Sequence, residues 1–315
     1  MFSIIIPLYN KGTYIEKAIK SVSVQTFQEF ELIVVDDGST DNSLENLRFT
    51  IYDLQLSEEK ILIVEQQNQG VSMARNNGVK LAKYDYIAFL DADDWWEPTY
   101  LEEMKGLIDT YPEAALYGSS YFKVLPDRLV PANIGVEKGF ESGIINYCRV
   151  YAKTMYQPIW TGAAIIKRII FEEENGFNQI LKLGEDFDLW IRVAMKYPVA
   201  LLNKPLAYYN QVVDIDNRAI GEKIYKPEEN MLFTDYGKWM NDPDFRQMYE
   251  VLALYGLMKY YTADEYKKDI NKILNTIQWD NHPRKYKIYY KLLSPALVKW
   301  WFSLLKLGSN IKKLF

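Results

Sequence analysis

Two aspartates one residue apart, Asp91 and Asp93, directly follow an apolar run at residues 86–90. Carboxylates at this spacing can share a divalent cation with diphosphate oxygens, because Mg²⁺ and Mn²⁺ prefer oxygen ligands and need few from the protein. An isolated Asp-x-Asp also fits an acidic turn that caps the next helix, and taken alone the motif favours that turn. Its function therefore depends on the other polar groups that the fold brings to it.

Three further positions carry side chains suited to the same chemistry. Arg75 is a permanent planar cation that suits a diphosphate oxygen, although a single arginine is also common on any solvated surface. Asp186 precedes an expected helix at 187–196, where a carboxylate can act as a general base or simply as the helix N-cap. Asp36 and Asp37 close an apolar run and indicate either a ligand site or a turn with the following glycine.

Alternating strands and helices must position these groups. Strands are expected at residues 3–8, 31–35, 60–64 and 86–90, with helices at 15–22 and 72–83. Continuous apolar strands that alternate with amphipathic helices predict an α/β fold with a mostly parallel sheet flanked by helices. Ligands bind at the carboxyl ends of such strands, where the polar clusters of this chain fall.

The alternation weakens beyond residue 100, and from about residue 228 the chain has the pattern of helices rich in Tyr, Trp, Met and Leu. We predict a catalytic α/β domain at 1–226 and a helical C-terminal region at 227–315. No apolar run reaches the roughly 18 residues of a membrane span, and the first residues indicate a strand and not a signal peptide. The single cysteine, Cys148, suits a reducing compartment, so a cytoplasmic location is expected.

The end of the chain is basic. All 42 Asp and Glu precede residue 281, whereas residues 281–315 hold eight Lys and Arg. If residues 296–313 form a helix, one polar stripe recurs at intervals of three and four, made of Lys299, Ser303, Lys306, Asn310 and Lys313. The remaining circumference is apolar, which predicts an interfacial helix on an anionic membrane surface. The alternative is that this face packs on the protein itself or on a second subunit as a homodimer. The acidic remainder of the chain gives no reason to expect a nucleic-acid partner.

Five motifs in order resemble the inverting family 2 glycosyltransferases of the Rossmann-like GT-A fold, in their bacterial non-processive type. They cover residues 3–190 and comprise Pro7 to Asn10, Glu31 to Asp41, Gly70 with Ala74 to Gly78, Phe89 to Asp94, and Gly184 to Trp190. The resemblance implies a GT-A domain with a C-terminal helical extension. Its ordered motifs outweigh the turn interpretation of the isolated Asp-x-Asp.

The resemblance implies a nucleotide-sugar site, with a UDP-sugar as the expected donor. Its expected residues are Pro7, Leu8, Tyr9, Asp37, Asn68, Arg75, Asp91, Ala92 and Asp93. Asp37 would accept the uracil N3 proton, which cytosine lacks. Asp93 and Asp91 would hold the cofactor, a divalent Mn²⁺ or Mg²⁺.

The resemblance also assigns Asp186 as the general base that takes the proton of the acceptor hydroxyl. Expected residues on the acceptor side are Trp160, Gly162, Glu185 and Trp190. The predicted function is transfer of one sugar to an acceptor hydroxyl, such as that of a lipid-linked glycan in bacterial surface polysaccharide synthesis. A nucleotidyltransferase and a non-catalytic nucleotide-sugar binding protein are the alternatives.

Two family features are missing. The loop at 210–216 lacks the histidine that members often use for metal or phosphate, so Asp214, Asp216 or water would have to replace it. The Gln-x-x-Arg-Trp signature of processive synthases is also absent, which favours single-sugar addition. The only histidine, His282, lies in the basic tail and is expected at the surface.

Overall fold

The computed structural model describes residues 1–57, 59–212 and 223–301. The chain divides into two compact units, Met1–Gly221 and Glu222–Phe315, called unit 1 and unit 2 below. Within the described ranges, no helix combines the length and the apolar character that crossing a bilayer requires.

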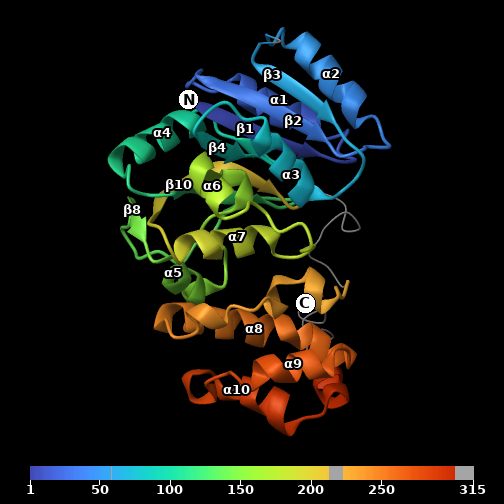
Figure 1. The fold of residues 1–315 in the computed structure, drawn as a ribbon, viewed down its shortest axis with the longest axis vertical. Helices are drawn as coiled ribbons and strands as arrows, with labels where there is room; N and C mark the ends of the chain where they lie inside the picture. Colours follow the sequence, from blue (N-terminus) through green and yellow to red (C-terminus); the bar gives the residue numbers. More distant parts are fainter. Residues whose placement is uncertain (58, 213–222, 302–315) are drawn as a thin grey trace. The chain divides into compact units, whose positions relative to one another are not determined.

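The first half of unit 1 is the predicted parallel arrangement (Figure 1). Its strands are β1 (Phe2–Leu8), β2 (Phe30–Asp36), β3 (Ile61–Glu65) and β4 (Tyr86–Phe89). They lie in the order β3-β2-β1-β4, and β1 pairs in parallel with both β2 and β4. Because Leu8 pairs with Asp36 and Ile5 with Phe89, the segments after these strands emerge at one edge of the sheet.

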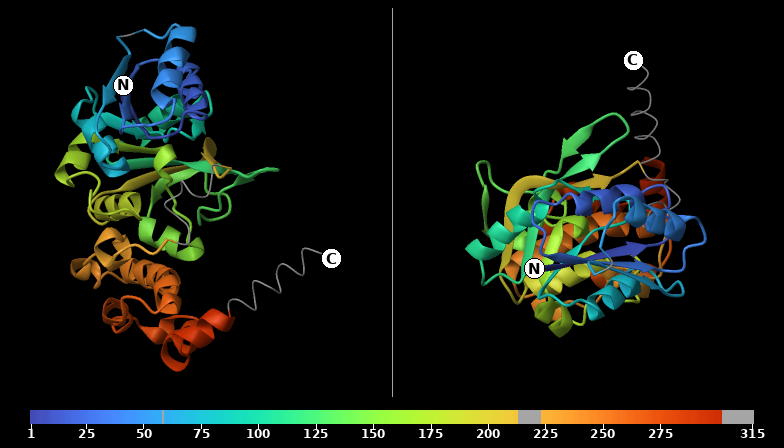
Figure 2. Two further views of the ribbon diagram at one scale, coloured as in Figure 1. Left: turned by 90° about the vertical axis from the view of Figure 1, so that its right-hand side faces the viewer. Right: turned by 90° about the horizontal axis from the view of Figure 1, so that it is seen from above.

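The second half of the sheet is mixed, which the strand pattern did not predict. It contains β5 (Trp95–Trp96), β6 (Leu116–Val124), β7 (Leu129–Pro131), β8 (Ser142–Ile145), β9 (Ala164–Lys167) and β10 (Val199–Asn210). β9 lies between β4 and β6 and is antiparallel to both, while β10 runs parallel to β6. β6 and β7 form a hairpin that stands out from the body of unit 1 (Figure 2).

Helices cover both faces of the sheet (Figures 1 and 2). The elements are α1 (Ile15–Ser23), α2 (Ser43–Asp53), α3 (Val71–Lys80), α4 (Tyr100–Thr110), α5 (Tyr147–Thr154), η1 (Thr161–Ala163), α6 (Arg168–Glu173) and α7 (Glu185–Ala194). The contact of α3 with β1 is close, since a Cβ on Gly78 would lie 2.6 Å from Cγ2 of Ile5. Glycine at this position therefore fixes how α3 lies on the sheet, and with it the place of Arg75.

Unit 2 is helical, with a long central helix α8 (Pro243–Ala263). The other elements are η3 (Pro227–Glu229), η4 (Met231–Phe233), η5 (Gly237–Trp239), α9 (Lys267–Leu274), η6 (Trp279–Asn281), α10 (Arg284–Lys287) and η7 (Ile288–Leu292). Asp242 caps α8 by accepting from the backbone N–H of Phe245, and Phe245, Leu254 and Leu257 form its buried side. Burial of this apolar side is what stabilises a helical unit of this size.

His282 was expected at the surface, and that prediction was wrong. Its side chain is 4% exposed, and Nε2 lies 2.6 Å from Oε2 of Glu250. Glu250 is buried on α8 and also accepts from the backbone N–H of Gln278. A buried carboxylate requires partners of this kind, so His282 is part of the core of unit 2.

Candidate active site

The loop after β4 brings two carboxylates next to two cations. Oδ1 of Asp91 lies 2.6 Å from Arg75 NH2, and Oδ2 of Asp93 lies 2.7 Å from Lys11 Nζ. Helix α4 has Thr99 as its N-cap, so the aspartates do not cap it. Residues 91–94 do form a turn, closed by the backbone N–H of Asp94 donating to the carbonyl of Asp91, but this turn does not cap the helix and instead brings two carboxylates next to two cations.

Arg75 is buried at 4% exposure, which excludes the solvated surface alternative. Its guanidinium lies 5.2 Å from the ring centroid of Phe177, and the neighbouring Asn76 holds the backbone of Phe177 through two hydrogen bonds. NH1 also lies 3.2 Å from Oε1 of Glu185. Burial lowers the pKa of Arg75, but Asp91 and Glu185 raise it by more, so the guanidinium stays charged.

Glu185 and Asp186 form the first turn of α7, where the positive end of the helix dipole favours carboxylates. The N-cap of this helix is Gly184, whose φ of 79° suits glycine, so Asp186 is not the N-cap. Oδ2 of Asp186 accepts from the Thr161 hydroxyl at 2.7 Å, and Oδ1 accepts from the backbone N–H of Phe187. Burial, and then the charge of Asp186, raise the pKa of Glu185 to about 7.

A second connection between the loop after β4 and the start of α7 runs through Trp160 and Thr161. Asp94 accepts from the Trp160 indole N–H at 3.0 Å, and Thr161 follows directly with its bond to Asp186. A Cβ on Gly162 would lie 3.0 Å from Trp160 Nε1 and 3.2 Å from Oδ2 of Asp94, so a side chain there would disturb this bond. Burial, and then Asp93 and Asp91, raise the pKa of Asp94 well above its ordinary value.

Asp37 occupies the end of β2 and binds the loop that precedes α3. Its Oδ1 accepts from Gln66 Nε2 at 2.7 Å and from the Gln69 backbone N–H at 2.8 Å, and Oδ2 accepts from the Gly70 backbone N–H at 2.8 Å. The side chain is buried at 3% exposure. One lone pair on Oδ2 therefore remains for a further donor, such as a base N–H.

The remaining predicted residues differ in what they can offer. Tyr9 is 45% exposed and Asn68 is exposed, while Pro7 and Trp160 are partly exposed. Leu8, Ala92 and Trp190 are buried apolar residues, so their side chains offer no hydrogen-bonding group to a ligand from the surface. Trp190 packs against Phe89 and Phe177 in the core of unit 1, and its place on the acceptor side stays a prediction.

A divalent metal fits Asp91 and Asp93. Each carboxylate has one oxygen paired with a cation and a second oxygen without a hydrogen-bond partner among the described residues. Among the described residues, no three or more His, Cys, Asp or Glu side chains lie together in a way that could hold a metal ion. Mg²⁺ typically takes one or two protein carboxylates and completes its shell with phosphate oxygens and water, which matches this pair.

Three residues that contact Asp93 or Asp186 were not predicted from the sequence, namely Lys11, Thr161 and Gln157. Gln157 Nε2 lies 3.4 Å from Oδ1 of Asp186. Lys11 could have been predicted, because it closely follows the carboxyl end of β1. Thr161 and Gln157 could not, because only the folded chain brings them to α7. Asp214 and Asp216, the suggested replacements for the missing histidine, lie outside the described residues.

Comparison with known proteins identifies the chain. Residues 3–163 match the family model of glycosyl transferase family 2. Glycosyltransferase GlyA of Streptococcus pneumoniae is 25% identical over 76% of this chain, and the matched part is 32% of that protein. An uncharacterized glycosyltransferase of Haemophilus influenzae is 24% identical over 99% of this chain and 94% of its own length. The chain thus spans about a third of the length of GlyA.

Solved structures share the fold. TarS of S. aureus (residues 1–349, in complex with UDP-GlcNAc) has a TM-score of 0.60 and 20% identity, over 93% of this chain and 76% of that one. The mannosyltransferase PcManGT of Pyrobaculum calidifontis, in complex with GDP-Man and Mn²⁺, has a TM-score of 0.58 and 17% identity, over 95% and 87%. The fold is therefore that of the GT-A glycosyltransferases, as predicted. Within this class, the chain belongs to glycosyl transferase family 2.

Proposed function

We propose that this chain transfers one sugar, with inversion, from a UDP-sugar to an acceptor hydroxyl, and that it is not processive. The observation that carries the proposal is the Arg75 guanidinium, which contacts Asp91 after β4 and Glu185 at the start of α7. This pair of contacts links the loop that carries the expected diphosphate ligands to the first turn of α7, which carries the expected base, and so supports the proposal. Displacement of a nucleoside diphosphate requires such a cation on one side and a proton acceptor on the other.

In this mechanism Asp186 takes the proton of the acceptor hydroxyl while the hydroxyl oxygen attacks the anomeric carbon. Thr161 and the N–H of Phe187 hold the carboxylate in one orientation. Arg75 and Lys11 neutralise the departing diphosphate. Asp93 and Asp91 would hold a divalent metal, which would supply further positive charge to the departing diphosphate.

Two alternatives make different predictions. Family membership argues against a nucleotidyltransferase, and a non-catalytic binder would bind donor without turning it over. A thermal-shift screen of UDP-, GDP- and dTDP-sugars with Mn²⁺ tests the donor class, because a ligand that binds only the folded state raises the melting temperature. The proposal requires that UDP-sugars give the largest shift. A larger shift with GDP- or dTDP-sugars would contradict the UDP assignment.

Asp37→Ala is expected to weaken UDP binding by about 1 to 3 kcal/mol, because the base N–H loses its acceptor. The same change also removes the three bonds to the loop at 66–70, so the melting temperature should fall too. Isothermal titration with UDP measures the first effect and a thermal melt the second.

Gln66→Ala is the matched control for this prediction. It removes one of the same loop contacts, together with the bond that Gln66 accepts from Asn77, but leaves the carboxylate of Asp37 in place. UDP affinity should therefore stay close to that of the unchanged protein. If Asp37→Ala binds UDP normally, or if both variants lose affinity equally, base recognition lies with Asp36 or Asn68.

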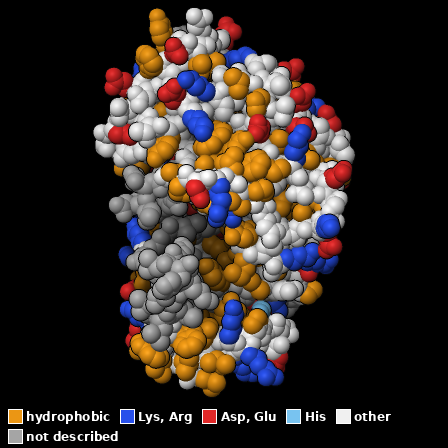
Figure 3. Space-filling model, turned by 180° about the vertical axis from the view of Figure 1, so that it is seen from behind, with side chains coloured by type: hydrophobic (Ala, Val, Ile, Leu, Met, Phe, Trp, Pro, Cys, Tyr) orange, Lys and Arg blue, Asp and Glu red, His pale blue; other side chains and the backbone are white. Residues whose placement is uncertain are grey.

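For the acceptor we propose a lipid-linked glycan reached from the membrane surface on the cytoplasmic side. In unit 2, Leu292, Leu297, Trp300 and Trp301 are 75%, 52%, 59% and 45% exposed, whereas Val298 is buried. Exposed hydrophobic side chains and basic ones gather at the lower end of unit 2 (Figure 3). Exposed tryptophans next to lysines are typical of interfacial helices. The polar stripe from Ser303 onward lies outside the described residues.

We expect the protein to float with anionic phosphatidylglycerol vesicles, to be released by high salt, and not to float with neutral vesicles. The double variant Trp300→Ser/Trp301→Ser should remain in the soluble fraction. We prefer this double variant to a chain truncated after Pro283. The truncation would remove Tyr290, which is buried and whose hydroxyl donates to the carbonyl of Leu254, so it would disturb unit 2 itself. If the unchanged protein fails to float, the surface is a packing or dimer face.

A further inference from the structure

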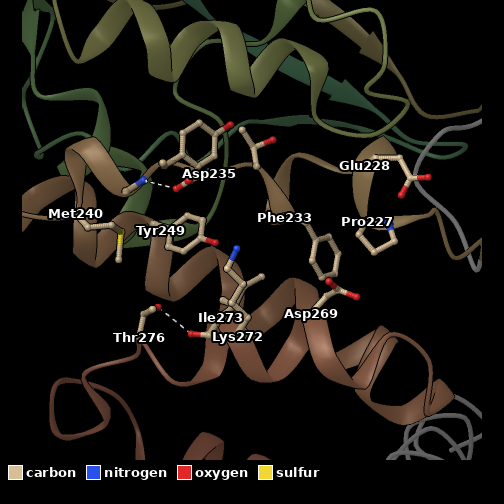
Figure 4. Close-up of a pocket in the computed structure, with 13 residues that line it drawn as sticks. Pro227, Glu228, Phe233, Asp235, Met240, Tyr249, Asp269, Lys272, Ile273 and Thr276 are labelled. Carbon is tan, nitrogen blue, oxygen red and sulfur yellow. Dashed lines mark hydrogen bonds between the residues drawn. The ribbon is translucent and has the colours of Figure 1, made fainter.

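Unit 2 contains a cavity of about 350 Å³ that the donor chemistry does not use. All its lining residues belong to unit 2, from the segment at 227–240, helix α8, helix α9 and Thr276 just after α9 (Figure 4). Its volume falls in the range of small-molecule sites, which runs from roughly 300 to 1,000 Å³. It is large enough to hold one or two sugar rings.

The walls of the cavity combine aromatic rings with hydrogen-bonding groups. Phe233, Tyr236 and Tyr249 line it, and the Tyr249 hydroxyl donates to the carbonyl of Leu232. Burial, and then Asp235, raise the pKa of Tyr249 to about 12, so its hydroxyl stays protonated and its oxygen can accept from a ligand. Aromatic walls of this kind give a ligand apolar contact area beside the hydrogen-bonding groups.

Three carboxylates line the same cavity from different elements. Asp235 and Glu228 come from the segment at 227–240, and Asp269 comes from α9. Oδ1 of Asp235 accepts from the Gly237 backbone N–H, and within the described ranges no ion pair engages Glu228 or Asp269. Carboxylates are acceptors only, so they suit a ligand that presents several hydroxyl donors.

The charges and ring orientations disfavour two other ligand classes. Three carboxylates against the single Lys272 disfavour an anion such as phosphate. A quaternary ammonium needs open ring faces. The faces of Tyr236 and Tyr249 stack on Trp239 and Phe245, with interplanar angles of 18° and 12°. A neutral polyhydroxy ligand fits both constraints.

We propose that this cavity binds a neutral saccharide, namely a sugar unit of the acceptor glycan. The acceptor assignment rests on the proposed function, whereas the saccharide site itself does not. Such a site would hold the acceptor chain independently of the nucleotide-sugar, and so raise the acceptor's effective concentration at the enzyme.

The test is a titration of the full chain, saturated with UDP, with lactose, cellobiose and N,N′-diacetylchitobiose, followed by saturation-transfer NMR. We expect at least one disaccharide to bind, and Asp235→Ala and Asp269→Ala to weaken that binding roughly tenfold or more, because each removes a charged acceptor. Asp280→Ala is the matched control, since Asp280 is 98% exposed and lies outside the cavity.

UDP affinity, measured on the same proteins, separates this proposal from the donor assignment. All four proteins should bind UDP equally, because the changed residues lie in unit 2. The saccharide site is overturned if none of the three disaccharides binds, if both cavity variants bind like the control, or if choline or inorganic phosphate competes with the sugar. A protein that binds saccharide but not UDP would instead overturn the proposed donor.

Discussion

Asp186→Asn is expected to lower the rate of sugar transfer by roughly 10²- to 10⁴-fold, because the amide cannot accept the proton of the acceptor hydroxyl. The amide oxygen can still accept from the backbone N–H of Phe187, and the amide NH2 can donate to the hydroxyl oxygen of Thr161, so the shape of the site and the affinity for UDP should persist. Initial rates of UDP release with acceptor measure the loss, and titration with UDP measures the retained binding.

Asp188→Asn is the matched control on the same helix. Asp188 is buried and pairs with Arg192 at 2.9 Å, so its amide variant should lower the melting temperature while leaving the transfer rate nearly unchanged. If Asp186→Asn stays within a few-fold of the unchanged protein, or if both variants lose the same fraction of rate, Asp186 has a structural role only and the base lies elsewhere.

Removing divalent metal with EDTA should abolish transfer, and Mn²⁺ or Mg²⁺ should restore it. Asp93→Ala should lose activity even with metal present, because Asp91 then remains as the only carboxylate ligand of the pair. The same variant also frees Lys11, whose ammonium lies 2.7 Å from Oδ2 of Asp93. Transfer rates across a metal titration distinguish a weakened metal site from a lost one.

Asp85→Asn provides the control for this second prediction, since Asp85 is 88% exposed and pairs only loosely with Arg168 at 3.6 Å. It should keep both the rate and the metal dependence of the unchanged protein. Full transfer in EDTA would contradict a metal role. Lys11 and Arg75 would then be the groups that neutralise the diphosphate.

The sequence was most informative where one element alone determines a position. The apolar runs before Asp37 and Asp91 predicted the strands and the sheet edge on which these residues lie, because parallel strands end at the same edge. A strand was expected at 162–167, where β9 lies, but its antiparallel direction was not predicted, since direction depends on pairing with β4 and β6 and not on the strand's own pattern.

Contacts between distant segments could not be predicted from spacing. Lys11 is 82 residues from Asp93, and the Arg75–Glu185 pair spans 110 residues. His282 was misplaced for the same reason, because the basic composition around it gave no indication of Glu250, 32 residues earlier. A tryptophan at helical spacing, such as Trp190, does not indicate whether it faces the core or a ligand until the helix is docked.

Turnover of the donor tests the central claim most directly. The protein, a UDP-sugar and Mn²⁺ are incubated without acceptor, and released UDP is measured against an Asp93→Ala control. We expect slow UDP release by the unchanged protein, through attack of water on the sugar, and none above background by the variant. Binding of UDP-sugar without release, or equal release by both proteins, would contradict an active site at Asp91, Asp93 and Asp186.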